Sequence, residues 1–157
     1  MKTAVVYYSH SGNVKDAAEK IAAALSARLF TLEPKKPLKG TGFLSIFKGG
    51  GQATLGQKPA LKSIPDLADF DRVILGTPVW AGKCAAPVNT LLASGALKGK
   101  ELSVFTASGG GDDRKALSQI AAAAQVPLHT VSLIDARVPA SSDNGTKIDA
   151  FIEKLKD

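Results

Sequence analysis

The fold is indicated near the start of the chain, by the stretch Thr3-Ala4-Val5-Val6-Tyr7-Tyr8-Ser9-His10-Ser11-Gly12-Asn13-Val14. Residues 3–8 form a continuous apolar run rich in β-forming side chains, which is typical of a buried parallel strand. A short polar loop follows, and helical periodicity begins at once, with apolar side chains on one stripe from Val14 to Leu25. We therefore predict a strand that leads through a loop into a helix packed on a sheet.

The same alternation continues along the rest of the chain. We predict further strands over Leu29–Glu33, Arg72–Gly76, Leu102–Thr106 and Leu128–Ile134. We predict helices that start near Pro87, after Asp112 or Asp113, and after residues 143–146. Five strands alternating with helices indicate an α/β fold with a parallel sheet, right-handed crossovers and helices on both faces. Because no two strands are joined by a short turn, hairpins are not expected.

Residues 34–65 interrupt this alternation. The segment has four prolines, six glycines and an apolar run, Phe43–Phe47, which we expect to be a short helix ended by Lys48 and residues 49–51. It also has six lysines and no acid, whereas the remaining 125 residues carry 14 positive and 14 negative side chains, so the net charge of +6 lies here. The lysines are Lys35, Lys36, Lys39, Lys48, Lys58 and Lys62. We expect one domain over residues 1–157 with a basic, Gly/Pro-rich excursion at 34–65.

Composition narrows the class of protein. The 157 residues are 45% apolar and 22% charged, which is ordinary for a globular domain. Cys84 is the only cysteine, so we expect no disulfide and a reducing, cytoplasmic location. No signal-peptide pattern opens the sequence, and the longest uncharged run, residues 116–134, contains Pro127 and several polar side chains, so no membrane span is expected. Four scattered arginines and the lack of a binding motif argue against nucleic acid.

Ligands of open parallel sheets bind beyond the carboxyl ends of the strands, which draws attention to three loops. The first, Ser9–Val14, leaves a strand and opens a helix, so its backbone N–H groups and hydroxyls suit a phosphate, although Ser11 could equally be a helix cap. The second, residues 76–83, holds the only tryptophan, which either stacks on a ring or folds back on the core. The third, residues 107–113, has three glycines that either admit a ligand closely or form a flexible turn.

These segments together resemble the flavodoxin-like family. Two motifs carry the resemblance: Tyr8-Ser9-His10-Ser11-Gly12-Asn13, and Leu75-Gly76-Thr77-Pro78-Val79-Trp80-Ala81-Gly82 followed by Pro87-Val88-Asn89-Thr90-Leu91-Leu92. The resemblance covers nearly the whole chain and implies a single three-layer, doubly wound domain, a five-stranded sheet in the order 2-1-3-4-5, and one non-covalently bound FMN.

The resemblance also implies which residues hold the flavin. The phosphate would lie on Ser9, His10, Ser11, Gly12, Asn13 and Val14. The isoalloxazine would lie against Thr77, Pro78, Val79, Trp80, Ala81 and Gly82, and its other edge against Ser108, Gly109, Gly110 and Gly111. Two departures stand out: Val14 replaces a second hydroxyl residue common in the family, and the third loop has no aromatic side chain to cover the flavin.

Several other chemistries fail on single residues. A nucleotide P-loop requires a lysine where Gln57 stands, and a cysteine phosphatase requires an arginine where Thr90 stands, six residues after Cys84. Cys84 is therefore interpreted as a packing residue. No G-x-G-x-x-G motif opens a helix, and His10 and His129 are the only histidines, so neither a dinucleotide site nor a metal site is expected. No general base or nucleophile is evident, which is typical of a protein whose cofactor carries the chemistry.

We therefore predict an FMN-binding redox protein that transfers electrons, without catalytic side chains of its own. It is either an electron carrier or an NAD(P)H-dependent reductase of flavins or quinones, and its basic character favours acidic partners. The alternative is a flavin-free binding module that holds a partner through residues 34–65. Phe43–Phe47 is expected to cover the cofactor or to pack on a second subunit as a homodimer, or else to form an ordinary crossover helix on the sheet.

Overall fold

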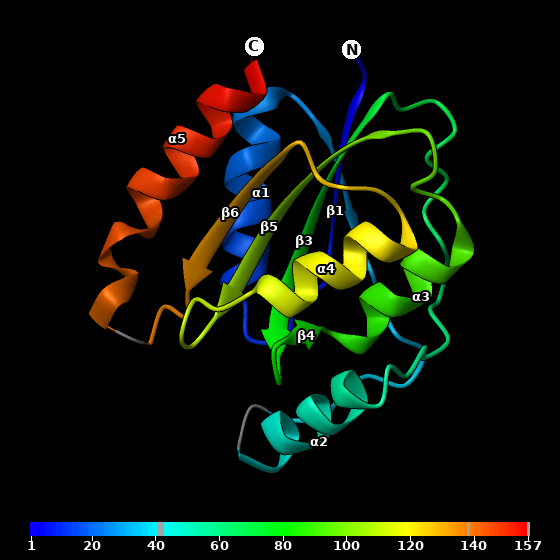
Figure 1. Ribbon diagram of the computed structural model, residues 1–157, viewed down its shortest axis with the longest axis vertical. Helices are drawn as coiled ribbons and strands as arrows, with labels where there is room; N and C mark the ends of the chain where they lie inside the picture. Colours follow the sequence, from blue (N-terminus) through cyan, green and yellow to red (C-terminus); the bar gives the residue numbers. More distant parts are fainter. Residues whose placement is uncertain (41–42, 138, 157) are drawn as a thin grey trace.

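A computed structural model describes residues 1–40, 43–137 and 139–156, and of these the side chains at 43–47, 53, 139 and 140 lie outside the description. The elements follow the chain in a strand–helix alternation (Figure 1). They are β1 (Thr3–Tyr7), α1 (Asn13–Leu25), β2 (Arg28–Thr31), α2 (Phe43–Thr54), β3 (Arg72–Trp80), β4 (Lys83–Cys84), α3 (Ala86–Ser94), β5 (Glu101–Ser108), α4 (Arg114–Ala123), β6 (His129–Ile134), the 3₁₀ turn η1 (Pro139–Asp143) and α5 (Asn144–Lys156).

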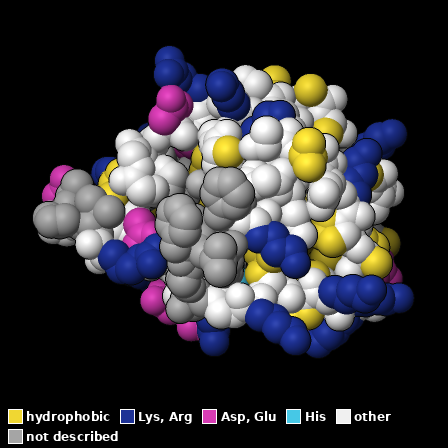
Figure 2. Space-filling view, turned by 90° about the horizontal axis from the view of Figure 1, so that it is seen from below, with side chains coloured by type: hydrophobic (Ala, Val, Ile, Leu, Met, Phe, Trp, Pro, Cys, Tyr) yellow, Lys and Arg dark blue, Asp and Glu magenta, His cyan; other side chains and the backbone are white. Residues whose placement is uncertain are grey.

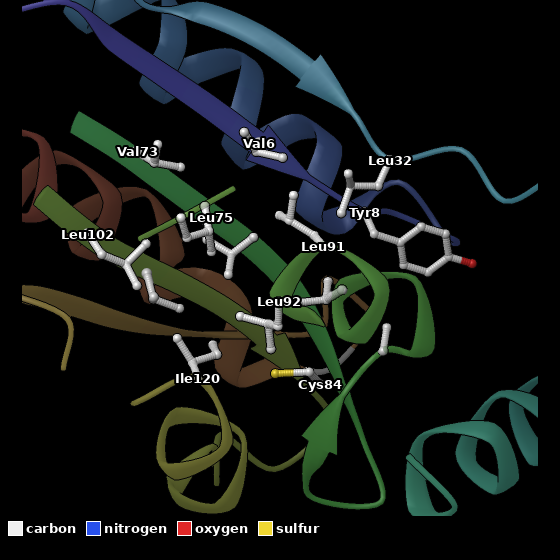
Figure 3. Close-up of a cluster of buried hydrophobic side chains, with 14 of the residues drawn as sticks. Val6, Tyr8, Leu32, Val73, Leu75, Cys84, Leu91, Leu92, Leu102 and Ile120 are labelled. Carbon is white, nitrogen blue, oxygen red and sulfur yellow. The ribbon is translucent and has the colours of Figure 1, made fainter. Parts of the chain in front are cut away.

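The sheet confirms the predicted fold. Its five long strands run parallel in the order β2-β1-β3-β5-β6, which is the predicted order once the two-residue β4 is set aside. Alternate residues of each strand face opposite layers: Val5 and Ile74 pack on α1 and α5, whereas Val6 and Leu75 pack on α3 and α4. Figure 3 shows the second of these layers. Both faces of the sheet are therefore covered, as a parallel sheet requires.

One connection contradicts the expectation that no hairpin is present. Strand β3 does not end at Gly76 but continues to Trp80 and turns back into β4, with Trp80 opposite Lys83. The two turn residues, Ala81 and Gly82, have φ values of 50° and 79°, as a type I′ hairpin turn needs. The residues up to Trp80, predicted as a loop, therefore lie in a strand, where their side chains are held more rigidly than loop side chains.

Helix α2 contradicts the prediction that residues 48–51 end a helix, because it runs on to Thr54. A Cβ atom built on Gly49 would lie 2.8 Å from Cζ3 of Trp80, so the glycine lets the helix backbone pack directly on the indole. This tertiary contact outweighs the low helix propensity of glycine. Figure 1 shows α2 beyond the carboxyl ends of the strands, and not on a face of the sheet, so the interpretation as an ordinary crossover helix is wrong.

The segment after α2 is tied to the hairpin and to α3. Lys83 donates a hydrogen bond to the carbonyl of Thr54, the last residue of α2, at 3.2 Å, and in the segment that follows Asn89 donates to the Gln57 carbonyl at 3.0 Å and Thr90 to the Pro59 carbonyl at 2.7 Å. These bonds fix the end of α2 and residues 57–59 at the edge of the sheet. Among the described residues, no helix combines the length and the apolar character that a membrane crossing requires.

Candidate functional site

A cavity of about 820 Å³ opens at the carboxyl edge of the sheet, within the size range of small-molecule and cofactor sites. Of the predicted residues, those that line it are Ser9, His10, Ser11, Asn13, Val14, Pro78, Val79, Trp80, Ala81, Ser108 and Gly109. The other lining residues are Gly50, Gly51, Thr54, Leu55, Ala107, Asp135 and Arg137. The structure thus brings the three predicted loops together around one space.

The first wall is the N-terminus of α1. Gly12 is its N-cap residue, with φ of 100°, and no side-chain hydrogen bond caps the helix. The Ser11 hydroxyl instead accepts a hydrogen bond from the Asn13 amide at 3.2 Å, so the interpretation of Ser11 as a cap is wrong. Because the first helical N–H groups, those of residues 13–15, have no intrahelical partner, they are available to an anion.

Val14 does not offer the loop another hydrogen-bond donor. Its side chain is buried and belongs to the cluster between the sheet, α1 and α5. The hydroxyl that the family commonly has here is therefore replaced by a core contact. Val14 therefore adds no hydroxyl donor for an anion at this loop.

Trp80 forms the second wall. Its indole is partly buried, lies edge-on to Tyr8 with ring centroids 5.8 Å apart, and lies edge-on to His10 at 6.0 Å. The backbone of α2 packs against it at Gly49. Trp80 packs against the core cluster and also lines the cavity, so the fold-back interpretation is confirmed, and its stacking on a ligand ring stays a prediction. The indole is thus a fixed apolar surface at the site.

Helix α2 supplies a third wall that the sequence did not predict residue by residue. Gly50, Gly51 and Thr54 line the cavity from its last two turns, and Leu55 follows with a side chain 74% exposed. The predicted covering residues were Phe43–Phe47, whose side chains lie outside the described part of the chain. Residues 49–51 were predicted to end the helix, and for that reason Gly50 and Gly51 were not predicted as lining residues.

Asp135 and Arg137, which directly follow β6, were not predicted. Arg137 donates hydrogen bonds from Nε to Oδ1 of Asp135 at 3.0 Å and from Nη2 to Oδ2 at 2.7 Å. These bonds hold the pKa of the Asp135 carboxyl at about 2, well below its usual value, against an opposing effect of desolvation. The signal that could have found them is their position after a strand carboxyl end, the same signal that found the other loops.

The remaining predicted residues lie outside the main cavity. Thr77 is fully buried, and its hydroxyl donates to the Pro78 carbonyl at 2.8 Å. Gly82 and Gly110 line a neighbouring cavity of about 400 Å³, which shares four lining residues with the first. Gly12 and Gly111 shape loops instead: the Gly12 N–H donates to the Ser9 hydroxyl at 3.2 Å and the Gly111 N–H to the Ser108 hydroxyl at 2.7 Å.

Cys84 behaves as the packing residue that was predicted. It is fully buried, its sulfur lies 3.6 Å from the Ala116 carbonyl, and burial raises the pKa of its thiol to about 12. Figure 3 shows its sulfur pointing toward Ile120. A thiol held protonated in this way is a poor nucleophile. In the described part of the chain, no group of His, Cys, Asp and Glu side chains is arranged to hold a metal ion.

Comparison with known proteins places this geometry among relatives. The sequence model of a protein family described as Flavodoxin matches residues 2–155. A proposed flavoprotein from Bacteroides uniformis has 22% identity and a TM-score of 0.77, over 99% of this chain and 98% of that one. A flavoprotein from Lactobacillus acidophilus, solved in complex with FMN, has 24% identity and a TM-score of 0.70, over 93% and 97% of the two chains. A WrbA-like flavodoxin from Agrobacterium tumefaciens has 16% identity and a TM-score of 0.58, over 99% and 97%.

Proposed function

The chain belongs to the flavodoxin family, and from this premise we propose that it binds one FMN non-covalently in the carboxyl-edge cavity and transfers electrons through it. The observation that carries the proposal is the composition of this single space, which joins an uncapped helix N-terminus to an apolar wall built on Trp80. When bound, the flavin supplies the redox chemistry, while the chain supplies binding, orientation and a dry surrounding.

The phosphate end of the site is the loop from Ser9 to Val14. The backbone N–H groups at the start of α1 and the hydroxyls of Ser9 and Ser11 are the donors that would hold a phosphate there. Their charge-assisted hydrogen bonds are the strong kind, worth about 1.5–3 kcal/mol each. A helix N-terminus that no side chain caps fits this use, since a cap would compete with the ligand.

The ring end of the site is mostly apolar. Pro78, Val79 and Trp80 contribute side chains from β3, and the glycines of α2 contribute backbone without side chains. Gly109, and Gly110 in the neighbouring cavity, let the backbone of the third loop approach a ring edge closely. In this proposal α2 takes the place of the missing third-loop aromatic, because it limits access of water to one side of the site.

Electron transfer fits this site better than acid–base or nucleophilic catalysis. The ionisable side chains among its described lining residues are His10, Asp135 and Arg137. Asp135 and Arg137 neutralise each other as an ion pair, and Cys84 is buried away from the cavity. In this proposal the chain binds and orients the cofactor, and the cofactor carries the redox chemistry.

The charge of the chain bears on its electron-transfer partner, and one kinetic assay separates a carrier from a reductase. The net charge of +6 favours an acidic protein partner in a cytoplasmic setting. Figure 2 views the face that α2 covers, where Lys and Arg side chains lie around a surface that also carries apolar ones. Steady-state oxidation of NADH or NADPH with a quinone acceptor separates the two forms of the proposal. Turnover would favour a reductase, and the lack of turnover would favour a carrier.

Sedimentation velocity tests the predicted homodimer.

The proposal is tested by titrating the apoprotein with FMN while the emission of its only tryptophan is followed. Because Trp80 lines the cavity, bound FMN should quench this emission strongly and saturably. Equilibrium dialysis of the same samples measures binding independently. Binding without a change in emission would contradict the place given to Trp80, and no binding by either method would contradict the proposed function.

A further inference from the structure

The ion pair of Asp135 and Arg137 lies in the wall of the cavity, and the proposal above gives it no task. Asp135 is fixed at the carboxyl edge because its backbone N–H donates to the Ser108 carbonyl at 2.8 Å. Arg137 is fixed on Asp135 by the two side-chain hydrogen bonds described above and by a third, from its backbone N–H to Oδ1 at 2.9 Å. This guanidinium is therefore pre-organised at the site.

The pair lies beside the phosphate loop. Both residues line the same cavity as Ser9 and Ser11, and the Asn13 side chain lies close enough to the Asp135 carboxylate to help lower its pKa. Asn13 is the first residue of α1. The Asp135 carboxylate thus lies near the N-terminus of α1, whose N–H groups are offered to a phosphate. Its negative charge opposes the approach of that phosphate.

Arg137 can offset this repulsion without leaving Asp135. A guanidinium has five N–H donors, of which Nε and one on Nη2 are used on the carboxylate. Within the described residues, Nη1 has no hydrogen-bond acceptor, and the side chain is 63% exposed. The group therefore has donors and space for a second anion while it stays bound to the first.

We propose that Arg137, held in place by Asp135, binds the phosphate of the cofactor and makes the site select FMN over riboflavin; this rests on the proposed function. Arg137 supplies the polar contact that Val14 cannot give, from a different strand end. Asp135 is a positioning residue, which orients the guanidinium and leaves an unpaired negative charge when the arginine is removed. The pair thus favours FMN because it adds affinity for the phosphate. It does not exclude flavins that lack one.

The test compares FMN and riboflavin affinities of the apoprotein by quenching of flavin fluorescence. Arg137→Ala should weaken FMN by about tenfold or more, and should change riboflavin by less than about twofold. Arg137→Lys, which keeps the charge but loses the fork, should lie between these results. Asp135→Asn combined with Arg137→Ala should recover part of the lost FMN affinity, because it removes the unpaired carboxylate.

A matched control is available in the same molecule. Arg114 makes the same pair with Asp112, at 3.0 Å from Nε to Oδ1 and 2.9 Å from Nη2 to Oδ2, and it does not line the cavity. Arg114→Ala should leave both affinities unchanged. The inference is overturned if Arg137→Ala leaves FMN unchanged, weakens both flavins equally, or matches Arg114→Ala. Wild-type protein that binds neither flavin would contradict the proposed function itself.

Discussion

Asp135 shows how one side chain links the stability of the chain to its site. Hydrogen bonds from Arg137 hold the pKa of this carboxyl at about 2, although desolvation acts in the opposite direction. The ionised form is therefore favoured in the folded state relative to the unfolded chain, where an aspartate has a pKa of about 3.9. Because the folded pKa is the lower one, the contribution to stability is present above the unfolded pKa and is lost as pH falls through about 2.

We predict that Asp135→Asn lowers the free energy of unfolding of the apoprotein at neutral pH by up to about 2 kcal/mol. The difference from wild type should shrink between about pH 4 and about pH 2, because wild-type Asp135 becomes protonated in that interval. Urea unfolding across this pH range measures it. Asp112→Asn, in an exposed pair of the same geometry, is the control and should have a smaller effect. A difference that does not depend on pH would contradict this account.

The residues of the site differ in how well the sequence predicts them. Ser9, Ser11 and Trp80 were predicted from position and residue type, and the structure puts all three on the cavity wall. Asp135 and Arg137 were not, because an Asp–Arg pair two residues apart is common on surfaces and carries no motif. Their place depends on where β6 ends relative to α1, which is a long-range contact that local sequence does not encode.

Helix α2 is the element whose sequence and structure disagree most. Three consecutive glycines lower helix propensity by about 1 kcal/mol each relative to alanine, which is why a helix end was predicted there. The structure keeps the helix because Gly49 packs on Trp80, and because Lys83 binds the carbonyl of Thr54 at the helix end. Tertiary contacts with one indole and one ammonium group thus decide the extent of this element.

We predict opposite effects for alanine at two of these glycines. Gly49→Ala should destabilise the apoprotein and change the tryptophan emission, because its Cβ would lie 2.8 Å from the Trp80 ring. Gly51→Ala, where a Cβ meets no protein atom within 4 Å, should stabilise the helix by about 0.5–1 kcal/mol. Thermal unfolding with emission spectra measures both. Equal effects at the two positions would show that α2 does not pack on Trp80 in solution.

At the scale of the whole molecule, the order of the parallel strands was predicted, but the hairpin was not, and the position of α2 at the carboxyl edge of the sheet was one of the alternatives left open. The α/β alternation predicted parallel strands, because buried strands and amphipathic helices have strong local patterns, and the resemblance implied their order, which the sheet has. The hairpin after Trp80 was missed because Ala81-Gly82 is a weak turn signal beside Asn-Gly or Asp-Gly. The hairpin and α2 form two of the walls of the cavity.

The central claim is that this cavity holds one FMN, and the absorbance spectrum tests it most directly. Apoprotein incubated with excess FMN and then passed through a desalting column should keep bands at about 370 and about 450 nm, with one flavin per chain. Riboflavin treated identically should be retained less, because it lacks the phosphate that the start of α1 is proposed to bind. Folded protein that emerges from the column without these bands would contradict the account.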